Sequence, residues 1–445
     1  MEQEFMKEKP VFPLVASMSL PMVLSMLVNA LYNIVDSYFV AKVSEDAMTA
    51  LSLVFPLQNL LTAAGVGFGI GINAVAAYEL GAQKPEAASK AISQGIFFNA
   101  IHGGFLTVVC IVGMPAFLRL FTEKYQVLDY GVGYSNIVFL FSCAVTIGVS
   151  FEKIFQAVGK MKVSMLCMLS GCVVNIILDP ILIFGFAGIP AMGIHGAALA
   201  TGIGQIVALL AYMIIFWVRP LPVRIIAKKS LFEDAVYRRI YAVGIPAALN
   251  MALPSFLITA LNGILASFSG MYVLILGIYY KLQTFIYLTA NGIVQGIRPL
   301  ISYNYGAQRS DRVRAVFKTA LLLGGIIMAM GTMFCLAFPE RLMKLFSDNL
   351  KTITYGAQAL RVISCGFVVS AVSVMVSGTF EGLGKGMPSL VISLIRYIAL
   401  IPIAYLLSVI FGAVGVWNAF WVTEILAAAV SLIMIRLIFA KMVRE

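Results

Sequence analysis

The chain has 445 residues, of which 61% are hydrophobic and 11% are charged. A soluble globular protein typically carries about 25% charged residues, so this composition excludes an ordinary soluble fold. The formal net charge of +11 does not indicate nucleic-acid binding, because no soluble basic domain is present to hold a nucleic acid.

Apolar stretches long enough to cross a bilayer, which takes roughly 20 residues, follow one another along the whole chain. Twelve are expected, at about 12–40, 48–78, 91–118, 128–158, 163–186, 194–218, 237–266, 271–300, 313–338, 353–380, 387–411 and 415–440. They are too long and too uniformly apolar for barrel strands. The sequence therefore predicts an all-α polytopic membrane protein.

Lysine and arginine indicate the orientation of these spans. With twelve spans, both termini and the loops after every even-numbered span lie on one face, and most basic residues fall there. The other face carries only Lys42, Arg119, Lys124, Arg341, Lys344 and Lys351. The positive-inside rule then predicts a multi-pass protein of the cell membrane with both termini in the cytoplasm.

The chain also repeats itself 225 residues apart. The string Tyr-Glu-Leu-Gly-Ala-Gln-Lys at 78–84 returns as Tyr-Asn-Tyr-Gly-Ala-Gln-Arg at 303–309, and Pro21 returns as Pro246. Six spans per copy predict two pseudo-symmetric six-helix lobes around a central site, as in transporters built from repeats. We expect lobes at 1–218 and 237–445, joined by a cytoplasmic linker at 219–236.

Two further expectations follow from the repeat. Loops 81–90 and 306–312 should be equivalent and cytoplasmic. Beyond Lys385 the spacing is read as 222 residues, which pairs Pro180 with Pro402 and Gly193 with Gly415.

The first span carries a polar stripe. Asn29, Asn33 and Asp36 follow i, i+4, i+7 spacing and share one helix face, with Tyr32 beside them. An aspartate in a membrane costs roughly 2.5–3.5 kcal/mol on insertion scales. A bound cation, a proton or hydrogen-bond donors should offset that cost. The alternative is a structural Asp36 solvated near the outer interface.

The fifth span repeats this pattern. Asn175 and Asp179 lie one turn apart, and Pro180 follows directly, which removes a backbone donor and gives the helix a point where it can bend. Thr201 in the sixth span adds a hydroxyl oxygen. Carboxylate, amide and hydroxyl oxygens suit Na+ or protons better than a transition metal. The alternative is that these groups only join helices.

The second copy serves as an internal control. At the 225-residue offset Asp36 matches Leu261, and at 222 Asn175 and Asp179 match Tyr397 and Ile401. Because the polar cluster exists in one lobe only, general helix packing does not require it.

No enzyme or cofactor signature stands beside this cluster. The six cysteines form no Cys-x-x-Cys pair, the two histidines lack metal-ligand spacing, and no P-loop string is present. We expect no catalytic residues and no cofactor beyond a coupling ion, H+ or Na+.

The two Gly-Ala-Gln loops, the paired prolines, the twelve spans and the Asn-x-x-x-Asp-Pro string together resemble the multidrug and toxic compound extrusion (MATE) transporters. The resemblance to their DinF-like branch implies a first-lobe cation site made by Asp36, Tyr134, Asn175, Asp179 and Thr201, with Na+ held by Asp36, Asn175 and Asp179. It also implies an antiporter that exports bulky, often cationic organic compounds.

The NorM-like branch instead places coupling carboxylates in the second lobe, where this chain has no match. The nearest acids are Glu381, interpreted as an interfacial charge beside Lys385, and Glu424. Glu424 is expected either to contact substrate or to pair with a basic group such as Arg396.

Methionine and aromatic side chains favour promiscuous binding of bulky cations. The candidate cavity residues are Asn29, Tyr32, Asn33, Phe55, Gln58, Tyr280, Gln283 and Glu424. We expect a monomer whose partners are small organic substrates and membrane lipid. A lipid-linked precursor flippase of the same superfamily is the alternative function, and a passive channel or membrane enzyme is a more distant one.

Overall fold

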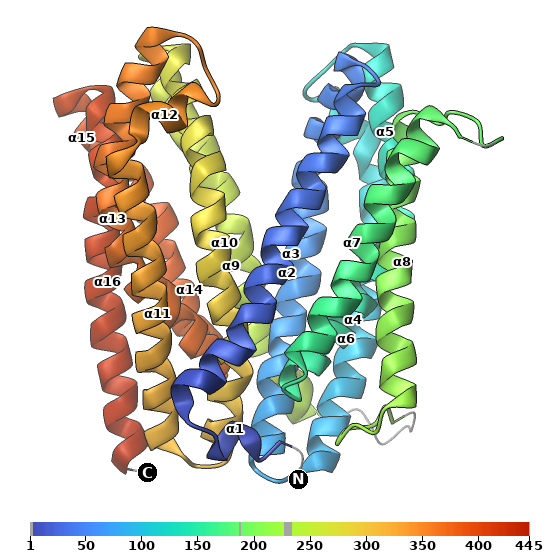
Figure 1. The fold of residues 1–445 in the computed structure, drawn as a ribbon, viewed down its shortest axis with the longest axis vertical. Coiled ribbons are helices and arrows are strands. Elements are labelled where there is room, and N and C mark those ends of the chain that lie inside the picture. The colour runs from blue at the N-terminus through green and yellow to red at the C-terminus, as the bar shows by residue number, and fades with distance from the viewer. Residues whose placement is uncertain (1–2, 187, 227–233, 445) are drawn as a thin grey trace. The chain divides into compact units, whose positions relative to one another are not determined.

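The structure is a computed structural model that describes residues 3–186, 188–226 and 234–444. Within these ranges the regular secondary structure is helical, apart from an isolated bridge between Phe186 and Ile189 (Figure 1). The helices are α1 Phe5–Glu8, α2 Val11–Ala41, α3 Glu45–Gly81, α4 Pro85–Arg119, α5 Tyr125–Leu140, α6 Ser142–Ala157, α7 Met161–Phe184, α8 Ile194–Val218, α9 Asp234–Ala266, α10 Gly270–Gly306, α11 Ser310–Ala337, α12 Pro339–Lys344, α13 Leu350–Gly382, α14 Gly386–Leu394, the π-helical turn η2 Ile395–Ala399, α15 Leu400–Phe411 and α16 Ala413–Arg444.

Eleven helical segments in the described residues are long and apolar enough to cross a membrane. The count becomes twelve if α5 and α6, which meet at 45°, are taken as one bent span. Helices α14, η2 and α15 form one of the eleven, Gly386–Phe411. The predicted all-α polytopic fold is confirmed, and each predicted stretch overlaps one of these segments.

The repeat is visible at the helix ends. The Ser44 side chain accepts a hydrogen bond from the Ala47 amide at the start of α3, and Ser269 accepts one from the Met271 amide at the start of α10. A serine in this position satisfies an amide that the first helical turn leaves without a partner. The same device thus begins the same helix in both copies.

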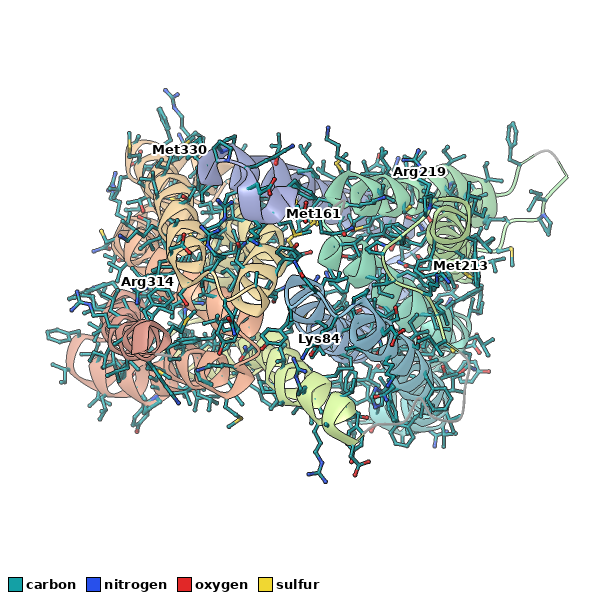
Figure 2. All side chains as sticks on the ribbon, turned by 90° about the horizontal axis from the view of Figure 1, so that it is seen from below. Lys84, Met161, Met213, Arg219, Arg314 and Met330 are labelled. Atoms are coloured by element: carbon teal, nitrogen blue, oxygen red, sulfur yellow. The ribbon has the colours of Figure 1, made fainter. Side chains whose placement is uncertain are left out.

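The two Gly-Ala-Gln loops are also the same turn. Gln83 and Gln308 both have a positive φ, 59° and 56°, which is uncommon for a residue with a side chain. In each turn the next residue donates its amide back into the helix, Lys84 to the Glu79 carbonyl at 2.9 Å and Arg309 to the Asn304 carbonyl at 2.8 Å. The predicted equivalence of the loops is confirmed. Figure 2 looks along the helices, with Lys84 labelled in the first of these turns.

The chain divides into two compact units. Unit 1 contains Leu24–Ala248, and unit 2 contains Glu4–Val23 together with Leu249–Glu445. The predicted lobes, 1–218 and 237–445, differ from this division because the first part of α2 belongs to unit 2 and the first part of α9 to unit 1. Part of the predicted linker, 227–233, lies outside the described residues, while the amides of Arg224 and Ile226 donate to Ser89 and Ser93 of α4.

Glycines allow close helix approaches within each unit. A Cβ on Gly67 would lie 2.5 Å from the Ala248 amide nitrogen in unit 1. A Cβ on Gly292 would lie 2.6 Å from the Val23 Cα in unit 2. The two contacts correspond under the 225-residue offset. Ala248 is the last residue of α9 that belongs to unit 1, and Val23 is the last residue of α2 that belongs to unit 2.

The predicted 222-residue spacing beyond Lys385 is wrong. Gly196 lies against the backbone of Leu182 and Ile183, and Gly415 lies in the same way against Leu407 and Ser408, so the offset between α7 and α15 is still 225. The shortening falls entirely in the following loop, where Gly193 and Gly412 share a positive φ, 56° and 64°. From there the offset is 219.

This correction changes four predicted pairings, including that of Gly193, which matches Gly412 instead of Gly415. Pro180 matches Tyr405 instead of Pro402, and Asn175 and Asp179 match Leu400 and Ala404. The matched positions remain apolar, so the internal control keeps its meaning.

Candidate functional site

Unit 1 contains two buried carboxylates on different helices. Asp36 is on α2 and is 8% exposed, while Asp179 is on α7 and is fully buried. The two side chains interact electrostatically, and both interact with the hydroxyls of Tyr32 and Tyr134. The structure therefore brings together acids that are far apart in the sequence. Since Asp36 is buried, the alternative of a solvated aspartate does not describe it.

Asn175 connects α7 to α8. Its Nδ2 lies 3.4 Å from Asp179 Oδ1 and 3.3 Å from Thr201 Oγ1, and it donates to both. Among the described residues, three buried oxygens of this cluster have no hydrogen-bond partner: Asp36 Oδ1, Asn175 Oδ1 and Asp179 Oδ2. Buried acceptors of this kind are costly unless a donor or a cation meets them. The cluster offers oxygen ligands of the type that a hard cation prefers.

Tyr134 joins this cluster from α5. It is 2% exposed, and its hydroxyl lies 3.3 Å from Gln58 Nε2 of α3, which donates to it. Gln58, predicted as a cavity residue, therefore contacts this polar cluster directly. Five helices of unit 1 thus contribute to one polar site in an apolar environment.

The other predicted cavity residues of unit 1 are more exposed than the acids of this cluster. Asn33 is exposed and donates to the Asn29 side chain at 3.1 Å. Tyr32 is half-buried and interacts electrostatically with both acids. Phe55 is 58% exposed on α3. No structural observation assigns a ligand to these four residues.

Pro180 lies inside α7, which runs continuously from Met161 to Phe184. It follows Asp179 directly, so any change at that carboxylate is one residue from the turn that the proline weakens. Its role as a hinge stays a prediction.

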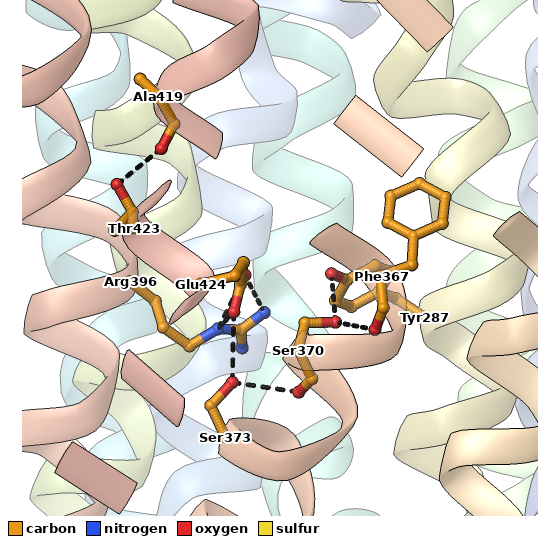
Figure 3. A network of polar contacts seen from close by, with 8 residues as sticks. All are labelled: Tyr287, Phe367, Ser370, Ser373, Arg396, Ala419, Thr423 and Glu424. Carbon is orange, nitrogen blue, oxygen red and sulfur yellow. Dashed lines mark hydrogen bonds and ion pairs between the residues drawn. The ribbon is translucent and has the colours of Figure 1, made fainter. Parts of the chain in front are cut away.

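The predicted cavity residues of unit 2 have different surroundings. Tyr280 and Gln283 are half-buried on α10. Glu424 on α16 pairs with Arg396, with Arg396 Nη2 2.9 Å from Glu424 Oε1 and Nε 3.2 Å from Oε2 (Figure 3). Of the two expectations for Glu424, pairing with Arg396 is observed, while a substrate contact stays a prediction.

The interpretation of Glu381 as an interfacial charge is wrong. It is 5% exposed and forms an ion pair with Arg298 at 2.7 Å. Asn250 Nδ2 and Ser389 Oγ also donate to Glu381 Oε1, at 3.3 Å and 3.1 Å. A helix-end position in the sequence does not reveal that four helices converge there.

The described residues contain no group of three or more His, Cys, Asp or Glu side chains that could hold a metal ion. His102 lies 3.0 Å from the Tyr241 hydroxyl, through Nε2, and packs against Phe68. The cluster around Asp36 and Asp179 therefore offers oxygen atoms from two acids, amides and hydroxyls.

Sequence reasoning missed the residues around the Arg396–Glu424 pair. Ser373 donates to Glu424 Oε2 at 3.2 Å, and Tyr287 donates to Ser370 at 2.8 Å. A signal exists in the sequence: Ser370 and Ser373 are three residues apart, and Tyr280 and Tyr287 are seven apart, so each pair shares a helix face.

Known proteins resemble this chain in sequence and in fold. The family model described as MatE matches the chain twice, over residues 21–181 and 246–406. The multidrug export protein MepA of Staphylococcus aureus (strain MRSA252) is 26% identical over 438 residues, which cover 98% of this chain and 95% of MepA.

Solved structures agree on the fold. An outward-facing multidrug resistance MATE family transporter of the MOP superfamily superposes with a TM-score of 0.91 at 22% identity, covering 97% of this chain and 96% of that one. A MATE structure in the bent conformation gives a TM-score of 0.93 at 22% identity, covering 100% and 98%.

Proposed function

The chain belongs to the MatE family, and from that premise we propose that it is a multidrug efflux antiporter coupled to a cation through unit 1. The observation that carries the coupling site is the pair of buried, mutually interacting carboxylates, Asp36 and Asp179. It is costly to ionise two interacting like charges together in an apolar environment unless a cation or a proton is shared between them.

The donor set supports Na+ or H+ as the coupling ion. Asp36, Asn175 and Asp179 would supply oxygens to Na+, and each has a buried oxygen without a hydrogen-bond partner among the described residues. Thr201 and Tyr134 would add hydroxyl oxygens. A proton would instead occupy one of the carboxylates and donate to the other oxygens. Either ion removes the excess negative charge of the cluster.

Transport would follow from that change of charge. Loading the cluster from outside alters the hydrogen bonds of Asp179, one residue before Pro180, and α7 would bend there. A ligand shifts a conformational equilibrium only by its differential affinity for the two states. Ion and exported compound should therefore affect each other's binding reciprocally.

The exported compounds would be bulky organic molecules, many of them cationic, as the name of the multidrug export relative suggests. The protein would act as a monomer in the cell membrane, with both termini and the two Gly-Ala-Gln turns in the cytoplasm. A lipid-linked precursor flippase is less well supported, because Arg298 and Arg396 are each neutralised by a glutamate.

The test is transport by Asp36→Asn in proteoliposomes. We expect gradient-driven efflux of a lipophilic cation to fall at least tenfold, because the neutral amide can neither release a proton nor balance Na+. Asp46→Asn is the matched control, since Asp46 is an acid of the same unit that pairs with Lys124 at 2.6 Å outside the cluster.

Imposing H+ and Na+ gradients separately identifies the ion. Normal gradient-driven efflux by the folded Asp36→Asn variant would show that the coupling site lies elsewhere.

A further inference from the structure

Unit 2 contains a buried polar cluster that the coupling site does not explain. Arg396 on the turn η2 holds Glu424 of α16 through Nε and Nη2, and Ser373 of α13 donates to the same carboxylate (Figure 3). The guanidinium also lies over the rings of Tyr287 and Tyr397, 5.8 Å and 5.3 Å from their centroids. Arg396 is 8% exposed and the Glu424 side chain 14%.

Helix packing does not require this ion pair. The corrected offsets match Arg396 with Gly171 and Thr423 with Gly204. In unit 1 these two glycines bring α7 and α8 together so closely that a Cβ on Gly171 would lie 2.6 Å from the Gly204 carbonyl oxygen. The crossing that backbone contact closes in unit 1 therefore has Arg396 and Thr423 in unit 2, with Glu424 directly after Thr423. A buried ion pair rarely stabilises more than apolar packing does.

The backbone at Arg396 is also unusual. Residues 386–407 form a helix with a π-helical turn at Ile395–Ala399, whereas the matching residues 161–182 lie in the α-helix α7. Since the two segments have the same length, no insertion causes the turn. Such turns inside α-helices are frequent at functional sites.

Hydrogen-bond donors remain unused around the pair. Arg396 Nη1 has no hydrogen-bond partner in the part of the chain that the structure describes, since the bonds of this side chain all come from Nε and Nη2. The buried Tyr280 hydroxyl likewise has no partner there, and Tyr280 lies two turns before Tyr287 on the same face of α10. Guanidinium and phenol groups donate to oxygen acceptors, and an arginine fork matches a carboxylate in geometry.

We propose that this cluster binds a carboxylate of the exported compound, so that unit 2 selects zwitterionic aromatic molecules over simple cations. Arg396 Nη1 and the Tyr280 hydroxyl would hold the carboxylate, and the rings of Tyr287 and Tyr397 would contact the aromatic part. Glu424 neutralises Arg396 when no ligand is bound. The proposal rests on the proposed export function, to which it adds a substrate class.

The test uses two dyes that differ in one group. Rhodamine B carries a free carboxylate and is a zwitterion, while its ethyl ester is a cation. Binding to the detergent-solubilised protein is measured by fluorescence polarisation. Arg396→Gln should weaken the binding of rhodamine B about tenfold or more, as expected for the loss of hydrogen bonds from a charged donor. Binding of the ester should change less than about twofold.

Two further variants control for folding and for charge. Arg396→Gln with Glu424→Gln leaves no unpaired buried charge, and it should lose the affinity for rhodamine B to the same extent. Arg361→Gln removes an exposed arginine of the same unit, which pairs with Glu340, and should change neither affinity.

The two proposals fail separately. Efflux of the ester by the unchanged protein reports on the export function alone. If the unchanged protein does not bind rhodamine B, or if both Arg396 variants bind the two dyes as it does, Arg396 is not a carboxylate site.

Discussion

Units 1 and 2 share the repeated order of long helices, although α5 and α6 of unit 1 meet at 45° where unit 2 has the continuous helix α13. They place their buried charges differently. Unit 1 has two buried acids, Asp36 and Asp179, with no basic side chain among their hydrogen-bond or ion-pair partners in the described residues. Unit 2 has apolar residues at the matching positions and instead carries a neutral pair, Arg396 and Glu424. One copy thus has buried acids whose charge no basic side chain of the described residues balances, while the other pairs its buried acid with an arginine.

A second difference lies near the turns that follow α6 and α13. Unit 1 pairs Lys153 with Glu152 at 2.7 Å, and Asn73 donates to the Lys153 carbonyl at 3.0 Å. Unit 2 pairs Arg298 with Glu381, also at 2.7 Å. These are not matching residues.

The offset of 225 aligns Arg298 with Asn73 and Glu381 with Gln156, while Ser389 aligns with Ser164. The positive charge has moved to a different helix, from α6 to α10. Each unit therefore keeps one charge pair in this region, although no charged position is shared. The requirement is a satisfied polar junction, not a particular acid or base.

The largest effect is expected when one charge of the Arg298–Glu381 pair in unit 2 is removed. Glu381→Gln would leave Arg298, whose side chain is 11% exposed, without its carboxylate. Breaking a buried pair in this way costs about 3–5 kcal/mol. We expect a loss of thermal stability in detergent that is larger than the loss from any glycine or turn substitution proposed below.

The matching residues of unit 1 suggest a second substitution that should restore the stability lost in Glu381→Gln. Arg298→Asn with Glu381→Gln gives unit 2 the residues that unit 1 has at the matching positions. Without an unpaired charge, the amides can bond with Asn250 and Ser389, and most of the lost stability should return. A double variant as unstable as Glu381→Gln alone would show that the ion pair itself holds the junction together.

The sequence was sufficient for the architecture because the repeat and the apolar stretches are long, strong signals. It also brought together Asp36, Asn175 and Asp179, since helix periodicity and the missing counterparts in the second copy both singled them out. It could not place Glu381, whose burial depends on four converging helices. It missed the role of Gln58 beside Tyr134 for the same reason: a hydrogen bond between distant helices leaves no local pattern.

The error in the repeat spacing has a physical cause as well. The pairing of Pro180 with Pro402 rested on residue identity alone. The backbone between α15 and α16 shows that Gly412 takes the place of Gly193, since both have a positive φ. The alignment of the two copies here depends on backbone conformation and on close helix contacts, which an amino-acid sequence does not show.

The glycine contacts provide a test of what the two units share. Gly67→Ala and Gly292→Ala should each destabilise the protein by about 1–3 kcal/mol, because the new methyl group meets backbone atoms that cannot move aside. The two losses should be similar, since the contacts are equivalent. Gly104→Ala and Gly325→Ala, where no atom lies within 4 Å of the new Cβ, are the controls and should be neutral or slightly stabilising. Unequal losses at Gly67 and Gly292 would mean that the two units do not share this contact.

The smallest expected effect is at the two Gly-Ala-Gln turns. Gln83 and Gln308 have φ values of 59° and 56°, where a side chain costs roughly 1 kcal/mol and glycine does not. Gln83→Gly and Gln308→Gly remove that strain, but they also give the unfolded chain more freedom, which offsets part of the gain. We therefore expect each change to stabilise the protein by less than about 1 kcal/mol, measured as a rise in the unfolding temperature. Gln83→Val and Gln308→Val are the opposing variants, because a β-branched side chain is strained at positive φ, and both should lower it. If glycine destabilises one turn and not the other, the glutamine there makes a contact that outweighs its backbone strain, and the turns are alike in backbone only.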